Sequence, residues 1–216
     1  MDWARTGRVD ADVRPLLPAW LQPVADFAER VRADDLTRFL PRDGEGRHSA
    51  VLILFGPARD VLLIGRARTM RAHAGQPAFP GGALDPGDAD AAAAALREAR
   101  EETGLDPTGV RVFGGLPDLR VPVSGFVVSP VLGWWERPTP VAPMDPAEVS
   151  SVHRIPIDDL VAPTNRCRVR HPSGYVGPGF EVDGLLVWGF TAGLLDGVLE
   201  GAGWAQPWDT ARVVDL

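Results

Sequence analysis

Three glutamates at helical spacing are the residues of this chain best suited to chemistry. Glu98, Glu101 and Glu102 stand at positions i, i+3 and i+4, so on a helix their carboxylates share one face. Their like charges repel, and anions near a helix C-terminus oppose its dipole by about 0.3–1 kcal/mol each. A divalent cation would resolve this conflict, and an all-oxygen ligand set suits Mg²⁺ or Mn²⁺ and not Zn²⁺. A solvated acidic face, partly neutralised by Arg97 and Arg100, is the simpler alternative.

An alanine-rich segment before these acids predicts the helix that carries them. The run 91–96 consists of strong helix formers, and Asp88 or Asp90 can cap its first turn. Gly104 supplies a left-handed stop, and Pro107 prevents continuation. We therefore expect a glycine-containing loop that leads into a helix with its acids in the last turns.

The residues around the acids resemble the Nudix box, which has a glycine, an acidic position and then REUxEExGU, where U is bulky and apolar. Gly82 is followed by Asp88 and then by the run REAREETGL at 97–105. Three details differ from the usual box. Eight residues separate Asp88 from Arg97 where seven are usual, Asp88 replaces a glutamate, and Ala99 is small.

With these differences, the sequence resembles the coenzyme A pyrophosphatase branch of the Nudix hydrolases. The run HAGQPAFPGG at 73–82 resembles the H-x-G-Q-x-x-F-P-G-G motif of that branch, with Pro77 where valine is usual. The run VWGFTA at 187–192 resembles its W-G-x-T-A motif. Together the resemblance covers about residues 48–200.

The resemblance implies a metal-dependent hydrolase acting on the diphosphate bond of coenzyme A or its thioesters. The products would be 4′-phosphopantetheine, or its acyl form, and adenosine 3′,5′-bisphosphate. Mg²⁺ or Mn²⁺ is the implied cofactor. Its implied ligands are Glu98, Glu101, Glu102 and the carbonyl of Gly82.

The resemblance also implies which residues act on the substrate. Glu98 is the first choice of general base and Glu148 the second, while Arg97 would orient Glu101 or Glu102. Arginines before the box suit phosphate recognition, because a guanidinium can bind phosphate bidentately. Solvated loop residues are the alternative for these arginines, and the adjacent histidine is a third candidate base. The predicted substrate-binding residues are Arg66, Arg68, Arg71 and His73.

Other functions stay open on the sequence alone. A Nudix hydrolase could act on ADP-ribose, NADH or another dinucleotide, or a modified nucleoside triphosphate. A Nudix-like domain could bind a nucleotide without turnover, although such a binder has little need of the costly acidic cluster. An isopentenyl diphosphate isomerase would be expected to have a different cysteine context from that of Cys167.

Composition places the chain among ordinary globular proteins. Its 216 residues suit one well-cored domain, with 45% hydrophobic and 24% charged residues. The net charge of −7 argues against nucleic-acid and anionic-membrane binding, and one cysteine excludes an internal disulfide framework. We expect a cytoplasmic enzyme with a small-molecule substrate, no nucleic acid or membrane partner, and a homodimer as a possible assembly.

The resemblance implies an α/β fold, a Nudix-type α/β/α sandwich around a mixed β-sheet. The expected organisation is an N-terminal helical arm at 1–45, a Nudix hydrolase domain at 46–202 and a C-terminal tail at 203–216. Pro122 and Pro130 are expected at an edge, a bulge or a strand start. The expected elements are one or two helices within 11–40 broken near Pro18 and Pro23, a hairpin of 50–55 and 61–64, strands at 110–114 and 121–134, a strand ending near 155–156, a hairpin around 171–174 and a closing helix at 188–199.

Overall fold

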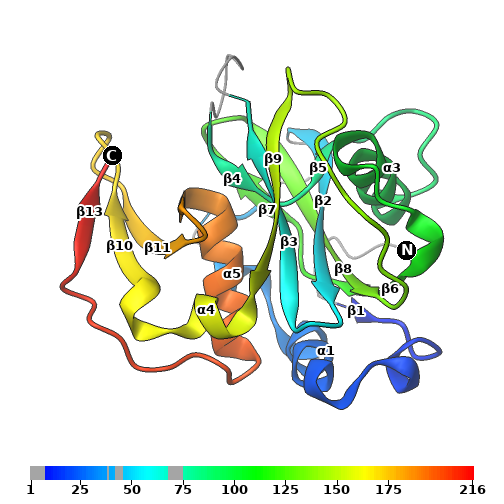
Figure 1. Cartoon of the computed structure of the whole chain (residues 1–216), viewed down its shortest axis with the longest axis horizontal. Helices are drawn as coiled ribbons and strands as arrows, with labels where there is room; N and C mark the ends of the chain where they lie inside the picture. Colours follow the sequence, from blue (N-terminus) through cyan, green and yellow to red (C-terminus); the bar gives the residue numbers. More distant parts are fainter. Residues whose placement is uncertain (1–7, 38, 42–45, 68–74) are drawn as a thin grey trace.

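The computed structural model of the chain describes residues 8–37, 39–41, 46–67 and 75–216. Its larger sheet has nine strands within these residues, in the order β1-β6-β8-β2-β3-β4, with β5 beside β2, β7 beside β8 and β9 beside β3 (Figure 1). The strands are β1 (Arg8–Val9), β2 (Arg47–Gly56), β3 (Asp60–Arg66), β4 (Pro77–Ala78), β5 (Gly81–Ala83), β6 (Val110–Gly115), β7 (Leu119–Val121), β8 (Phe126–Trp135) and β9 (Val149–Pro156).

Both faces of the larger sheet are covered, as alternation along β2 shows. Leu52 and Leu54 pack into a core cluster with the helix α3 (Ala91–Thr103). Ile53 and Phe55 point the other way, into a cluster that includes α1 (Gln22–Arg30) and α5 (Gly189–Gly201). Because β2 and β8 run parallel while the other pairs within the described sheet are antiparallel, the sheet is mixed. The expected α/β/α sandwich is confirmed.

Pro130 lies in a central strand, which differs from its expected place at an edge, bulge or strand start. It stands within β8, opposite Val51 of β2. A proline lacks an N–H, so it cannot donate a ladder hydrogen bond. On the other side of β8, β6 ends at Gly115 and β7 begins at Leu119, and the Pro130 carbonyl accepts from the Leu116 N–H at 2.9 Å. The interruption between two partner strands accommodates the proline.

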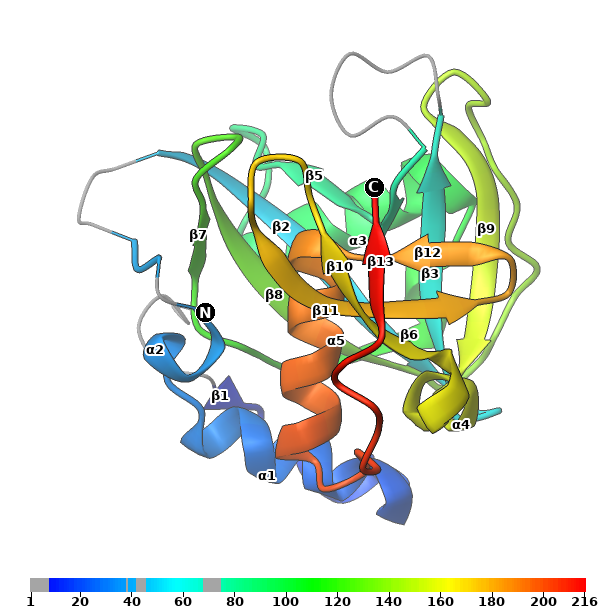
Figure 2. The same cartoon turned by 90° about the vertical axis from the view of Figure 1, so that its left-hand side faces the viewer.

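A second sheet of four strands within the described residues packs beside α5, in the order β12-β11-β10-β13 (Figure 2). The predicted hairpin around 171–174 is confirmed as β10 and β11, but β12 and β13 were not predicted, since each is only three residues long. Its strands are β10 (Arg166–Arg170), β11 (Val176–Val182), β12 (Leu185–Val187) and β13 (Val213–Asp215), and α4 (Ile157–Val161) leads into it.

The helix α1 near the N-terminus and the strand β13 near the C-terminus both contact the rest of the molecule. Val24 and Phe27 of α1 share a core cluster with Leu195 and Val198 of α5. Pro23 lies in the first turn of α1, where a missing N–H costs nothing, and the short helix α2 (Ala33–Leu36) follows. At the other end, β13 pairs in parallel with β10. The division at residues 46 and 202 stays a prediction.

No helix among the described residues combines the length and apolar character needed to span a bilayer.

Candidate active site

The helix α3 is fixed at both ends by its own sequence. The Asp90 carboxylate accepts a hydrogen bond from the Ala93 N–H at 2.9 Å, so Asp90 is the N-cap. Gly104 has φ 70°, and its N–H bonds to the Arg100 carbonyl at 2.9 Å. Glycine adopts this left-handed conformation without strain, which ends the helix directly after its acids.

Two of the three acids face the glycine pair that precedes the helix. Glu102 is only 7% exposed, and its carboxylate accepts a hydrogen bond from the Gly81 N–H at 2.9 Å. Glu98 has a 19% exposed side chain and packs on Gly82, where an added Cβ would lie 2.5 Å from the carboxylate. Since β5 also pairs with β2, the glycine backbone is held between the sheet and α3.

Arg97 organises the acidic residues around it. Its Nε and Nη2 bind Asp88 bidentately at 3.1 and 3.0 Å, and Nη2 also donates to the Ala83 carbonyl at 3.1 Å. Its Nη1 donates to Glu98 at 2.9 Å and to Glu101 at 3.1 Å. These contacts use the five N–H groups of the guanidinium. Asp88 first, and then Glu98, raise the pKa of Arg97 above its ordinary value.

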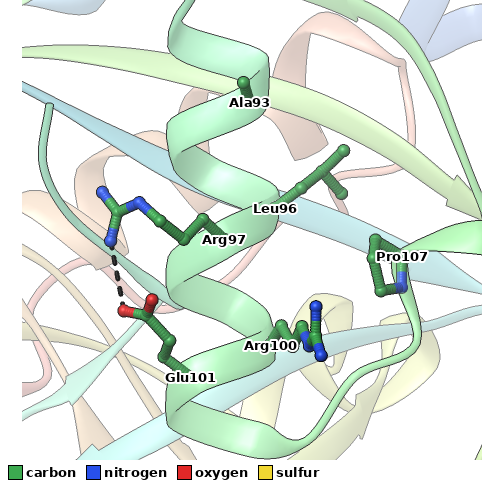
Figure 3. A pocket seen from close by; sticks show the side chains of 6 residues that line it. All are labelled: Ala93, Leu96, Arg97, Arg100, Glu101 and Pro107. Atoms are coloured by element: carbon green, nitrogen blue, oxygen red, sulfur yellow. Dashed lines mark hydrogen bonds and ion pairs between the residues drawn. The ribbon is translucent and has the colours of Figure 1, made fainter. Parts of the chain in front are cut away.

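Glu101 lies outside the buried pair. Its side chain is 59% exposed and points along the outer surface of α3 towards Arg97 (Figure 3). Figure 3 also shows Arg100 directed towards Pro107, and both residues line a surface pocket. Neither Glu98 nor Glu102 lines that pocket. It is lined by Ala93, Leu96, Arg97, Arg100, Glu101 and Pro107.

Burial dominates the electrostatics of the site. Loss of hydration raises the pKa of Glu102 to about 7, and the like charges of Glu98 and Glu148 add to the effect. The Gly81 N–H and the charge of Arg66 act in the opposite direction. Burial also raises the pKa of Glu98, against the lowering effect of Arg97. These carboxylates are therefore close enough to disfavour one another's charged forms.

Arg66 and Glu148 approach the buried acids from the other side of the site. Arg66 ends β3, and its Nε is buried without a hydrogen-bond partner in the described part of the chain. Glu148 is exposed, and its carbonyl accepts from the Ala67 N–H at 2.8 Å, which ties it to the end of β3. The other predicted substrate-binding residues, Arg68, Arg71 and His73, lie outside the described residues.

The described residues include no group of three or more His, Cys, Asp or Glu side chains arranged to hold a metal ion. Arg97 binds Glu98 and Glu101, and the Gly81 N–H binds Glu102. The chemistry of the donors nevertheless fits a hard cation. Carboxylate oxygens with raised pKa values gain from a nearby positive charge, and Gly82 leaves its backbone open beside Glu98.

Sequence reasoning missed two parts of this arrangement. Asp88 was considered as a helix cap and as the acidic position of the box, but its contacts make it the main partner of Arg97. The position of Asp88 within the box was the sequence feature that could have indicated this contact. The Gly81 N–H holds Glu102, where Arg97 had been considered as the residue that orients it. A backbone donor leaves no such signal in the sequence.

Comparison with known proteins agrees with this fold. The NUDIX domain family model matches residues 46–172. A protein named uncharacterized Nudix hydrolase NudL from Cronobacter sakazakii is 39% identical over 158 residues, covering 69% of this chain and 79% of that protein. The protein of the same name from Klebsiella pneumoniae is 38% identical over 184 residues, covering 75% of this chain and 90% of that protein.

A solved structure shows the same fold. The Nudix hydrolase RenU from M. smegmatis has a TM-score of 0.50 at 18% identity, over 78% of this chain and 99% of that chain. The sheet, the box helix and the family match define a Nudix-type α/β protein. The chain belongs to the NUDIX family, and the relatives it resembles are named Nudix hydrolases.

The contact between Gly82 and Glu98 predicts the effect of one methyl group. Gly82→Ala places a Cβ against the Glu98 carboxylate, so we expect hydrolytic kcat/KM to fall at least about tenfold through misplacement of that group. The free energy of unfolding should change by less than about 1 kcal/mol, since the flexible side chain of Glu98 can move away. The matched control is Gly87→Ala, where an added Cβ meets nothing within 4 Å. Equal activity of both variants would contradict the assigned role of this contact.

The raised pKa of Glu102 predicts a pH-dependent stability. Between its ordinary pKa of 4.5 and about 7, the folded protein binds more protons at this site than the unfolded chain. Stability from this group is therefore present below pH 4.5 and decreases as pH rises, by up to about 3 kcal/mol. The free energy of unfolding would be measured with urea, in the presence of a chelator, at pH 4.5 and pH 7.5. Between these two pH values it should fall by up to about 3 kcal/mol less in Glu102→Gln than in wild type. Parallel profiles would contradict the burial argument.

Proposed function

We propose that this protein hydrolyses the diphosphate bond of coenzyme A or its thioesters. The products would be 4′-phosphopantetheine, or its acyl form, and adenosine 3′,5′-bisphosphate. The reaction would depend on Mg²⁺ or Mn²⁺. A diphosphate is anionic, so positioning and charge neutralisation are the main tasks of the protein.

One observation supports the hydrolytic site above the others. Glu102 is buried and Glu98 half-buried against a glycine pair, and the charge of Glu148 reaches Glu102. Carboxylates that lose hydration and lie close together are costly, and stability alone would favour other residues. A cation that binds together with the phosphate substrate would offset the unfavourable free energy of these carboxylates.

Each predicted site residue within the described part of the chain has a proposed role in the reaction. Glu98 and Glu102 are the main metal ligands, Glu101 shares the site, and the Gly82 carbonyl completes the ligand set. When bound, the cation neutralises phosphate charge and lowers the pKa of a water molecule. Glu98 is the first candidate for the base that accepts the proton of the attacking water, and Glu148 is the second.

Two arginines divide the remaining work. Arg97 does not touch substrate in this proposal but holds Glu98 and Glu101 through its Nη1. Arg66 carries an unpartnered buried Nε beside Glu102, and a phosphate oxygen would satisfy it. The same oxygen would receive part of the developing negative charge.

The proposed specificity for coenzyme A depends on the segment before the box. Residues 68–74 connect Ala67, whose N–H binds the Glu148 carbonyl, to Gly75. On the far side of this segment the Gln76 carbonyl accepts from the Arg66 N–H at 3.1 Å, and the chain continues into β4 and β5. Arg68, Arg71 and His73 are proposed to bind the substrate, with the 3′-phosphate as a fitting target for the arginines.

Product analysis tests the substrate and the cleaved bond together. The protein would be incubated with Mg²⁺ or Mn²⁺ and, separately, with coenzyme A, ADP-ribose, NADH and nucleoside triphosphates. We expect mass spectrometry to find 4′-phosphopantetheine from coenzyme A, with little cleavage of the others. If another compound is cut while coenzyme A stays intact, the specificity proposal is wrong. If no compound is cut with either metal, a binding function replaces hydrolysis.

The exposures of the three helix acids predict a ranking of activities. Glu102→Gln should lower kcat by at least about 10²-fold, because a buried ligand is lost while the Gly81 N–H keeps an acceptor. Glu101→Gln should lower it less, since that side chain is 59% exposed. Circular dichroism would verify that both variants fold. Wild-type turnover in Glu102→Gln would refute the proposed metal role.

A further inference from the structure

A serine, a histidine and an aspartate form a connected chain of side chains away from the box helix. The Ser151 Oγ lies 2.8 Å from Nε2 of His153, and Nδ1 of His153 lies 2.5 Å from the Asp183 carboxylate. The two ring nitrogens therefore have different partners. With the proton on Nδ1 donated to Asp183, Nε2 is the acceptor for the Ser151 hydroxyl proton.

The local folds explain how these residues meet. Ser151 and His153 are two residues apart on β9, so they point to the same face. Asp183 lies in the two-residue turn between β11 and β12, and both Asp183 and Gly184 have positive φ, at 50° and 72°. Such a turn favours the Asp-Gly pair. Figure 2 shows the β11–β12 turn beside β9.

The serine hydroxyl occupies space left by a glycine. Ser151 stands opposite Gly65 of β3, where an added Cβ would lie 2.3 Å from the Ser151 Oγ. Ser151 is partly exposed, and the side chain of His153 is 16% exposed. The pair is therefore ordered by packing and also reachable from solvent.

The connected side chains of Ser151, His153 and Asp183 are separate from the carboxylates of α3. Val152, between Ser151 and His153, packs against the core cluster that contains α3. Because neighbouring residues of a strand point to opposite faces, Ser151 and His153 lie on the other face, towards the second sheet.

We propose that Ser151 is a nucleophile activated by His153 and Asp183, and that this second site cleaves carboxylic acyl esters. The order of contacts matches that of a serine hydrolase triad, in which the histidine takes the serine proton and the aspartate fixes its orientation. This activity is independent of the proposed diphosphate hydrolysis.

The reaction balances with water as its only co-reactant. The Ser151 Oγ bonds to the acyl carbon as its proton passes to Nε2 of His153, and the alcohol leaves with that proton. Water then gives a proton to Nε2 and its oxygen to the acyl carbon. The bond from Oγ to the acyl carbon breaks, and Ser151 regains its proton. The net reaction converts ester and water into acid and alcohol.

Acetylation by p-nitrophenyl acetate tests the proposal, with release of p-nitrophenol and peptide mass mapping as readouts. The chain contains no lysine, which removes a common source of background acetylation. We expect the adduct on Ser151 and a loss of at least about 10²-fold in acetylation rate in Ser151→Ala and His153→Ala. Asp183→Asn should lower the rate at least about tenfold, because asparagine preserves the turn but has no negative charge to stabilise the protonated His153.

Matched variants distinguish a nucleophile from a structural contact. Ser150→Ala removes the neighbouring hydroxyl, which donates to the Gly65 carbonyl at 3.0 Å, and should leave the rate unchanged. Glu98→Gln should abolish diphosphate hydrolysis and leave acetylation intact, so the two proposals fail separately. The inference would be overturned if folded wild type carried no adduct on Ser151 and released p-nitrophenol no faster than Ser151→Ala. An acetylation rate in folded His153→Ala equal to that of wild type would also overturn it. The contacts would then be structural, holding the two sheets together.

Discussion

The site depends on the five hydrogen bonds that the Arg97 guanidinium donates. One planar group joins the Asp88 loop, the Ala83 carbonyl of β5 and two acids of α3. Lysine could not replace it, because an ammonium has three donors and cannot bind a carboxylate in the same fork. Arg97 thus connects the loop before the helix to the face that carries the acids.

Burial of Glu102 is the opposing constraint. The helix could have placed an apolar residue against Gly81, as Ala99 does elsewhere on its buried side. A carboxylate at this position has its pKa raised to about 7, so near neutral pH its charge is only marginally tolerated. Bound positive charge would favour the ionised form. The site therefore combines an arginine that binds several acids with a buried carboxylate that accepts a hydrogen bond from a backbone N–H.

The sequence predicted the elements better than the side-chain environments. The helix, its Gly104 stop and the β2–β3 hairpin follow from local chemistry, and the structure confirms them. Sequence could not rank Glu101 and Glu102. At about 100° per residue they lie on opposite sides of Glu98, and only the position of β5 decides which is buried. Asp183 and His153 meet through two different sheets, so their contact had no sequence signal.

The proposed cation site is tested most directly by Mn²⁺ binding, followed by electron paramagnetic resonance of the free ion at pH 7.5. Wild type should remove free Mn²⁺ from solution, and Glu98→Gln and Glu102→Gln should each weaken binding at least about tenfold. Glu181→Gln, on the second sheet, is the control and should bind as wild type does. Equal binding by all four proteins, or no binding by wild type, would contradict the account.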